Sequence, residues 1–194
     1  MLKKSALLIA FVLILDQILK IWIKTNMMIG QEIQFFDWFI IHFTENKGMA
    51  FGMEFGGNLG KYILSIFRLI AIVAIGIYWY KLANTPIKKG IVYSISLILA
   101  GAIGNMIDSA FYGMIFSESY GQLATVFEGG YSSFLQGKVV DMFYFPLING
   151  HFPSWLPLVG GNHFIFFRPV FNIADAAIST GVINILIFHR SFFK

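Results

Sequence analysis

Few side chains in this sequence could do acid–base chemistry, and most of them interrupt long apolar runs. Cysteine is absent, which excludes a thiol nucleophile and cysteine-ligated metals. The four histidines lack metal-binding spacing, and neither H-E-x-x-H nor G-x-S-x-G occurs. Carboxylate chemistry therefore remains, and we expect no metal and no cofactor. The polar groups concerned are Asp16, Lys20, Arg68, Asn105, Asp108, Asp141, Asn172 and Asp175.

The composition shows why such groups are few. Of the 194 residues, 57% are hydrophobic and only 12% are charged, with a mean hydropathy of +0.73. A soluble domain carries about 25% charged residues, and a chain this apolar is not disordered. The net charge of +4 does not by itself indicate nucleic acid, and no such partner is expected. The sequence predicts an integral membrane protein.

Four apolar runs could cross a bilayer, which takes roughly 17–25 residues as a helix. Asp16 and Lys20 follow the apolar stretch 5–15, where a cleavable signal peptide would need small residues at its cleavage site, so we expect a retained helix. The prediction is an all-α membrane protein, a single domain over 1–194 with four transmembrane helices, the fourth of them short. The predicted spans are about 5–23, 62–80, 91–112 and 173–189.

The basic residues predict the direction of these helices. Lys3 and Lys4 precede the first run, three lysines fall between the second and third, and Arg190 follows the fourth, with no acid in any of these segments. The positive-inside rule therefore places both termini and the loop 82–90 in the cytoplasm. All ten acids then fall within a span or on the outer side.

The two predicted outer segments, 25–61 and 113–172, differ from ordinary loops. Glu32–Phe36 and Trp38–Phe43 are rich in aromatic and β-branched residues, so we expect a small extracytoplasmic β-sheet that could cradle a peptide. Phe143–Phe167 is crowded with Phe, Trp, Pro and Gly, which suits an interfacial aromatic loop that rests on lipid and closes over the site.

An ionisable group inside a span costs several kcal/mol, so each one needs a reason. Asp16 and Lys20 are spaced i,i+4 with the acid first, which favours a structural ion pair over substrate positioning. Lys20, Lys24 and Arg68 could instead extend to lipid head groups. Except for Arg68, these polar groups are predicted to converge at the outer ends of their helices.

The third and fourth runs carry amide–acid pairs. Gly101, Asn105 and Asp108 share a helical face with small neighbours, so that face should look inward, with Asp108 in a packing or network role rather than in direct chemistry. Asn172 and Asp175 begin the fourth helix. They fit a helix cap, but the apolar residues that follow also suit a functional acid, and both readings stay open.

Five short motifs, in order along the whole chain, resemble those of the bacterial lipoprotein signal peptidases (signal peptidase II, or prolipoprotein signal peptidase). Leu15–Lys20 resembles the first-helix motif, and Asn46–Gly52 is similar to the N-x-G-x-A-F segment. Gly104–Asp108 resembles G-N-x-x-D, Val139–Asp141 resembles V-x-D, and Phe171–Asp175 resembles F-N-x-A-D. Each motif alone is weak, but five in sequence on a four-span frame are highly specific.

The resemblance implies a membrane aspartic endopeptidase that removes signal peptides from diacylglyceryl-modified prolipoproteins, cutting before the lipid-bearing cysteine. Its catalytic pair would be Asp141 and Asp175, two carboxylates that share a proton and activate water. It also implies a monomer in the bacterial cytoplasmic (inner) membrane, in contact with membrane lipids and with its site at the outer face. The implied substrate-binding or supporting residues are Asp16, Lys20, Asn46, Gly48, Asn105, Asp108, Asn172 and Ala174.

One departure from the family pattern concerns a cation. The third motif usually closes with Arg, whereas this chain has Ser109, so the contact must be absent or supplied by another base such as Arg68, Lys138 or Arg168. The stretch from Asp108 to Asp141 is also long. Two other acids within it, Glu118 and Glu128, compete with Asp141 for the catalytic position, but neither has the Val-Val-Asp context.

An ion-coupled carrier or proton channel is the main rival hypothesis, because it also uses acids within helices. It would favour acids at mid-bilayer and two corresponding halves, which this sequence lacks. Another intramembrane aspartic protease is the nearest enzyme alternative, but no G-x-G-D motif occurs.

Overall fold

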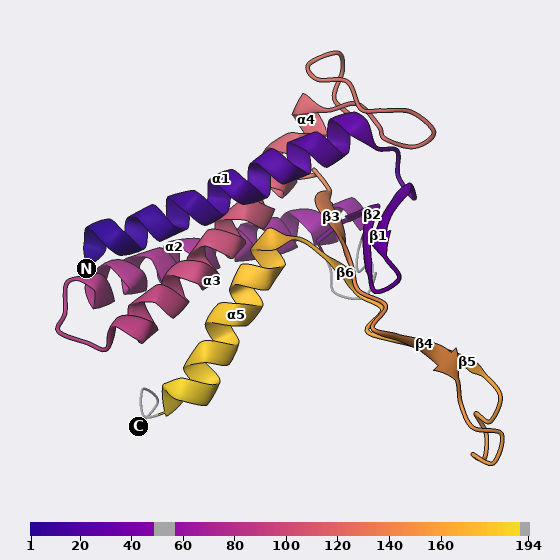
Figure 1. Ribbon diagram of the computed structural model, residues 1–194. Coiled ribbons are helices and arrows are strands. Elements are labelled where there is room, and N and C mark those ends of the chain that lie inside the picture. Colours follow the sequence, from indigo (N-terminus) through magenta and orange to yellow (C-terminus); the bar gives the residue numbers. More distant parts are fainter. Residues whose placement is uncertain (49–56, 191–194) are drawn as a thin grey trace.

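The structure is a computed structural model that describes residues 1–48 and 57–190. Helices occur at all four predicted places. They are α1 (Leu2–Asn26), α2 (Gly57–Ala83), α3 (Lys89–Ile107) and α5 (Ile173–Phe188), and α3 continues through a π-helical turn, η2 (Asp108–Tyr112), into the short α4 (Gly113–Ile115). The first residues of α1, the α2–α3 loop and the last turn of α5 lie at the same end of the molecule (Figure 1).

Three of these helical stretches are long and apolar enough to cross a membrane. They are Leu2–Asn26, Leu59–Ala83 and Lys89–Ile115. The first two expose many large apolar side chains, whereas the third is largely buried between its neighbours. The fourth, α5, has 16 residues and is shorter but equally apolar, as expected for the short fourth run. The predicted class, a helical membrane protein with a small sheet, is confirmed.

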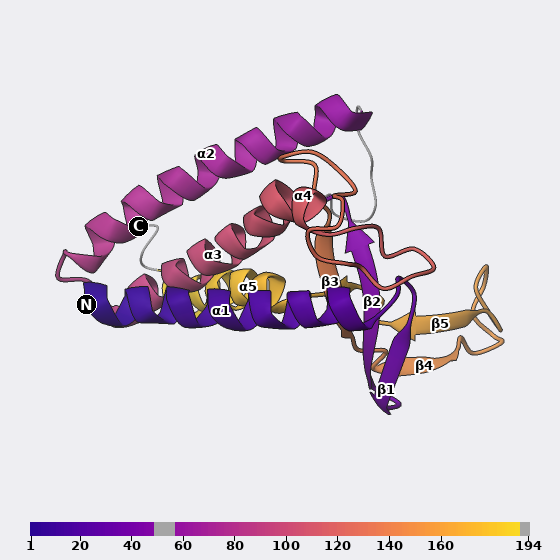
Figure 2. The same ribbon diagram turned by 90° about the horizontal axis from the view of Figure 1, so that it is seen from above.

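α3 lies at the centre of the helices, between α1 and α2 and against α5 (Figure 2). Its glycines allow the close approach. A Cβ at Gly101 would collide with the carbonyl oxygen of Ala174, and one at Gly104 would stand 2.8 Å from Asp16 Oδ2. The predicted inward face of α3 is therefore where three helices meet, which small residues permit.

A four-stranded antiparallel sheet covers the end of the helices opposite to the start of α1 (Figures 1 and 2). The strand order is β1-β2-β3-β6, and the bounds are β1 (Glu32–Phe36), β2 (Phe39–Asn46), β3 (Val139–Tyr144) and β6 (Val170–Phe171). Asp37, between the two predicted strand stretches, lies in the β1–β2 turn. Thr44 pairs with Asp141 and Phe143 with Phe171, so the sheet joins the start of β3 to the chain that enters α5.

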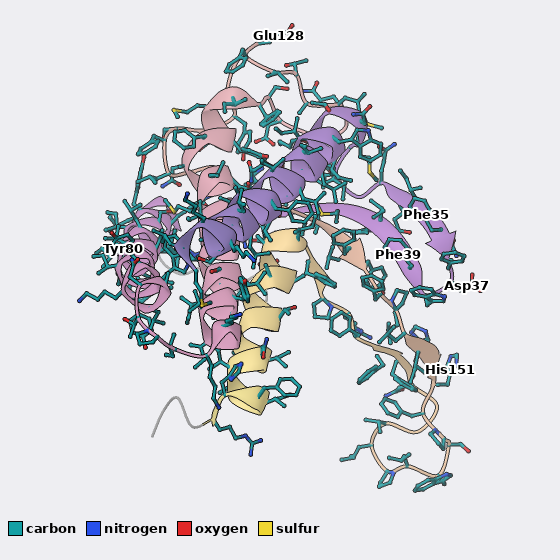
Figure 3. All side chains as sticks on the ribbon, turned by 60° about the vertical axis from the view of Figure 1, so that its left-hand side comes forward. Phe35, Asp37, Phe39, Tyr80, Glu128 and His151 are labelled. Carbon is teal, nitrogen blue, oxygen red and sulfur yellow. The ribbon has the colours of Figure 1, made fainter. Side chains whose placement is uncertain are left out.

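The aromatic segment expected as a loop contains a hairpin. β4 (Ile148–His151) pairs with β5 (His163–Phe166), and this hairpin with its tip, residues 148–166, is called the arm. It reaches away from the helices, and His151 marks its position (Figure 3). Phe152 stacks on Phe164 with ring centroids 4.5 Å apart. The arm is therefore held by its own aromatic contacts while much of its apolar surface stays exposed.

Candidate active site

Two amide side chains bring Asp141 and Asp175 to one place. Asn172 Nδ2 donates to Asp141 Oδ1 at 2.6 Å, and Asn105 Nδ2 donates to Asp175 Oδ1 at 2.7 Å. The two amides also bond each other, with Asn172 Nδ2 3.1 Å from Asn105 Oδ1. A strand, the third helix and the start of the fourth helix therefore hold two carboxyl groups in one hydrogen-bonded cluster.

Asp141 lies in the buried strand β3 and is only 3% exposed. One carboxyl oxygen accepts from Asn172 and the other from Asn46. Burial, followed by the charge of Asp175, raises the pKa of Asp141 to about 7, against the opposing effect of Lys20 and the two amide donors. Asp141 can therefore keep or lose a proton near neutral pH.

Asp175 serves as a helix cap and as a member of the cluster. Asn172 Oδ1 accepts from the Asp175 amide at 2.9 Å, and Asp175 Oδ2 accepts from the Asn172 amide at 3.4 Å, which completes a capping box. The other oxygen of Asp175 faces Asn105. The cap reading is therefore confirmed, and the cap leaves the second oxygen of Asp175 on the side of the cluster.

Lys20 lies beneath the cluster and is fully buried. Its ammonium group lies 2.9 Å from Asp16, 2.7 Å from Asp108 and 2.9 Å from Asn105 Oδ1. The predicted ion pair with Asp16 is present, and a second acid joins it. The three donors of Lys20 thus have three partners, and the Asn105 amide is turned so that its N–H group points to Asp175.

Asp16 and Asp108 connect this ion cluster to the backbone. Asp16 Oδ1 accepts from the Ala174 amide at 3.0 Å, next to the capping box. Asp108 Oδ2 accepts from the Val140 amide at 3.3 Å, next to Asp141. Gln17 bridges the two acids, because its Nε2 donates to Asp16 Oδ2 at 3.2 Å and to Asp108 Oδ1 at 3.0 Å. Asp108 therefore has the network role that its face predicts.

Asn46 and Gly48 complete the surroundings of Asp141. Gly48 donates its amide to Asn46 Oδ1 at 2.6 Å, which turns the Asn46 N–H group toward Asp141. Gly48 has a φ of +86°, a conformation that favours glycine. The rest of this predicted motif, Ala50, Phe51 and Gly52, lies outside the described residues.

Sequence reasoning missed a second charged cluster on the other side of β2. Lys24 is fully buried, pairs with Glu45, and lies 2.8 Å from Ser119 Oγ in the segment 113–138. Extension of Lys20 and Lys24 to lipid head groups is therefore wrong, because both ammonium groups have buried partners. Lys24 stands i,i+4 from Lys20, and that spacing was the available signal.

The segment 113–138 packs onto the sheet through the same cluster. Lys138 lies 3.3 Å from Glu45 and 3.2 Å from Glu118, and its ammonium group stands over the Tyr131 ring. Lys61 on α2 is buried and donates to the backbone carbonyls of Gln136 and Gly137. Of the two competing acids, Glu118 is thus a partner of Lys138, and Glu128 lies at the exposed tip of the segment (Figure 3).

No group of three or more His, Asp or Glu side chains within residues 1–48 and 57–190 is arranged to hold a metal ion. The cluster of Asp141, Asp175 and their two amide partners offers a buried carboxyl group of raised pKa, that of Asp141, beside a second carboxyl group. That arrangement suits a general acid and a general base acting on one water molecule.

Comparisons with known proteins agree with this chemistry. Residues 8–192 match the family model described as Signal peptidase (SPase) II. The lipoprotein signal peptidase of Porphyromonas gingivalis is 53% identical over 95% of this chain and 82% of its own length. That of Amoebophilus asiaticus is 40% identical over 92% of this chain and 74% of its own.

The fold is also similar to a solved structure described as a bacterial membrane enzyme. The TM-score is 0.62 at 28% identity, over 95% of this chain and 86% of the other. Together with the family match, this likeness accounts for the apolar helices and for the sheet at their end. The chain is a multi-pass membrane protein and belongs to the signal peptidase II family of peptidases.

Proposed function

We propose that this chain cleaves diacylglyceryl-modified prolipoproteins just before the lipid-bearing cysteine, with Asp141 and Asp175 as the catalytic pair. The supporting observation is the bridge of Asn172 and Asn105, which ties both carboxyl groups to each other through bonds of 2.6–3.1 Å. The relatives named above are lipoprotein signal peptidases, which supports this class of substrate.

In the proposed mechanism, Asp141 begins as the acid and Asp175 as the base. Asp175 takes a proton from water, whose oxygen attacks the scissile carbonyl carbon, while Asp141 gives its proton to the carbonyl oxygen. The tetrahedral intermediate then collapses and the C–N bond breaks. The amine leaves with a proton returned by Asp175, and one hydroxyl of the intermediate gives its proton back to Asp141, which restores the starting protonation of the pair. The raised pKa of Asp141 supports this assignment of roles.

The other predicted site residues act, in this proposal, by positioning. Asn105 and Asn172 orient the carboxyl groups, and Asn46 with Gly48 fixes the second oxygen of Asp141. The remaining members hold the helices together beneath the pair. These are Asp16, Lys20, Asp108 and Ala174.

The raised pKa of Asp141 leads to a pH prediction. Above pH 7 Asp141 loses the proton that the mechanism needs, so kcat/KM should fall about tenfold per pH unit from pH 7.5 to 9. The measurement is cleavage of a lipid-modified precursor by the purified protein in lipid bicelles. The unmodified precursor serves as the control and should stay uncut. A rate that is constant up to pH 9 would contradict the role of Asp141 as the acid.

We further propose that the protein is a monomer in the cytoplasmic (inner) membrane, with both termini inside and the cluster at the outer face. The lysines of the α2–α3 loop support this direction, because Lys88 and Lys89 have no neighbouring acid. The absence of cysteine makes the test direct. A cysteine placed at Trp155 should react with an impermeant thiol reagent from outside, and one at Asn84 should not.

The arm supports a proposed contact with membrane lipid. Trp155 is 79% exposed and Leu158 is fully exposed, although both are apolar. Replacing both with Ser should raise KM for the lipid-modified precursor about three- to tenfold with little change in kcat, because lipid contact is lost while the cluster is intact. Removing residues 152–161 should have a larger effect of the same kind. Tyr120→Ser, at an equally exposed aromatic residue away from the arm, is the control, and an unchanged KM in the double variant would reject the contact.

A further inference from the structure

Arg68 is the one charged side chain of α2 that lies deep within the apolar stretch Leu59–Ala83. A cation at such a position is costly unless protein groups replace its water. α2 packs mainly on α3, and Arg68 is half-buried, turned toward the loop that follows β2. Its partners should therefore explain why a cation is retained at this depth.

A short series of hydrogen bonds runs from Arg68 to Asp141. The Arg68 guanidinium donates to the carbonyl oxygen of Gly48, and the amide of Gly48 donates to Asn46 Oδ1 at 2.6 Å. Asn46 in turn donates to Asp141 Oδ2. A Cβ at residue 48 would stand 2.5 Å from Arg68 Nη1, so the guanidinium occupies the space that any other residue would need. The turn that orients the Asn46 amide toward Asp141 therefore packs against Arg68.

Arg68 also lies within electrostatic reach of Asp175, whose charge attracts it. Lys20 has the corresponding relation to Asp141. Each carboxyl group of the pair thus has its own cation, one from α1 and one from α2. Ser109, which stands where the family pattern has Arg, is buried and donates to the Asn105 carbonyl oxygen at 3.0 Å, so it adds no charge.

We propose that Arg68 is a positioning residue of the site, which fixes Asn46 through Gly48 and so aims the Asn46 amide at Asp141. This inference rests on the proposed catalytic pair. It assigns to α2 the cation that the family pattern places after Asp108. It also gives a second reason, beyond its φ, why residue 48 is glycine.

The test uses the absence of cysteine in this chain. In the R68C variant, one reagent attaches a methylthio group, which is neutral, and another attaches an aminoethylthio group, which restores a cation. With the neutral group, kcat should fall at least tenfold with KM little changed, because no cation then donates to the Gly48 carbonyl and the Asn46 amide is no longer aimed at Asp141. The aminoethylthio group restores an N–H donor and should bring kcat back to within several-fold of the wild-type value on the same folded protein.

Two further variants separate charge from geometry. R68K keeps the cation but should lower kcat several-fold, because an ammonium group lacks the planar fork that reaches Gly48. G48A also keeps the cation but should displace the guanidinium and lower kcat at least tenfold. K81Q removes a cation from the exposed far end of the same helix and should leave kcat and KM unchanged.

Equal kcat values in the neutral and cationic forms of R68C would overturn the inference. If R68C does not fold, a G48A variant with wild-type kcat overturns it. Activity that survives in both D141N and D175N would instead reject the catalytic pair itself, whatever Arg68 does. The two failures are therefore distinguishable.

Discussion

Replacing Asp141 or Asp175 singly by asparagine is expected to lower the rate of cleavage of a lipid-modified precursor by about 1,000-fold or more. An amide can neither take a proton from water nor give one to the scissile group, and each step of the proposed mechanism uses both carboxyl groups. The double variant should be scarcely slower than either single one, because the pair acts as a unit. The measurement is single-turnover cleavage in lipid bicelles.

Both variants should remain folded. At residue 141, asparagine accepts only one of the two amide bonds that reach Asp141, which costs about 1 kcal/mol. The folded-state pKa of Asp141 is raised, so the wild-type loses stability as the pH rises toward 7, and at pH 8 the neutral amide offsets that cost. The melting temperature should therefore change by only a few degrees.

The decisive comparison is with an acid outside the cluster. Glu128 lies at the exposed tip of the segment 113–138 (Figure 3), and E128Q should process precursor at the wild-type rate. A D175N variant with the activity of E128Q would leave Asp175 as a helix cap only. A D141N variant with that activity would remove the basis of the proposed pair.

Replacing Lys20 by methionine is expected to destabilise the protein by about 3–5 kcal/mol. Methionine has a similar length but no charge, so Asp16 and Asp108, which are at most 1% exposed, would remain buried without their cation. Asn105 would also lose the donor that orients its amide, so precursor cleavage should fall together with stability. Tryptophan fluorescence during thermal unfolding in detergent measures the first effect.

A matched variant on the same helix separates this effect from a general loss of charge. K3M removes an exposed lysine near the start of α1 and should change stability by less than about 0.5 kcal/mol. Adding D108N to K20M should recover part of the loss, because one of the two uncompensated carboxylates is then neutral. Equal melting temperatures for K20M and K3M would show that Lys20 does not stabilise the buried acids.

The parts of the fold and site that sequence could predict are those that depend on local spacing. Four apolar runs give the four helices, because backbone in lipid must satisfy its own hydrogen bonds. The i,i+4 spacing of Asp16 and Lys20 predicts their ion pair, and the small residues beside Asn105 predict the inward face of α3. Asn172 with Asp175 predicts the cap. Each of these features needs only neighbours along one helix.

What could not be predicted depends on distant contacts. Nothing local links Arg68 to Gly48, or Lys24 to Glu45, and these pairs meet only when α2 packs near the loop after β2 and α1 packs against β2. The π-helical turn at Asp108–Tyr112 has no sequence signature, yet it sits between the ion cluster and that segment. The strands of the arm were also hidden, because aromatic residues suit both an interfacial loop and a hairpin.

The cluster draws its members from both ends of the polypeptide, with consequences for how the enzyme is made. Lys20 is synthesised long before Asp108, and the capping box of α5 follows only after the rest of the site. In a growing chain, Lys20 is therefore present before its second acid, and Asp175 joins the site last. If Asp175 is the base, as proposed, hydrolytic competence should arise only when α5 packs against α3, so unfinished chains should leave nearby signal peptides uncut.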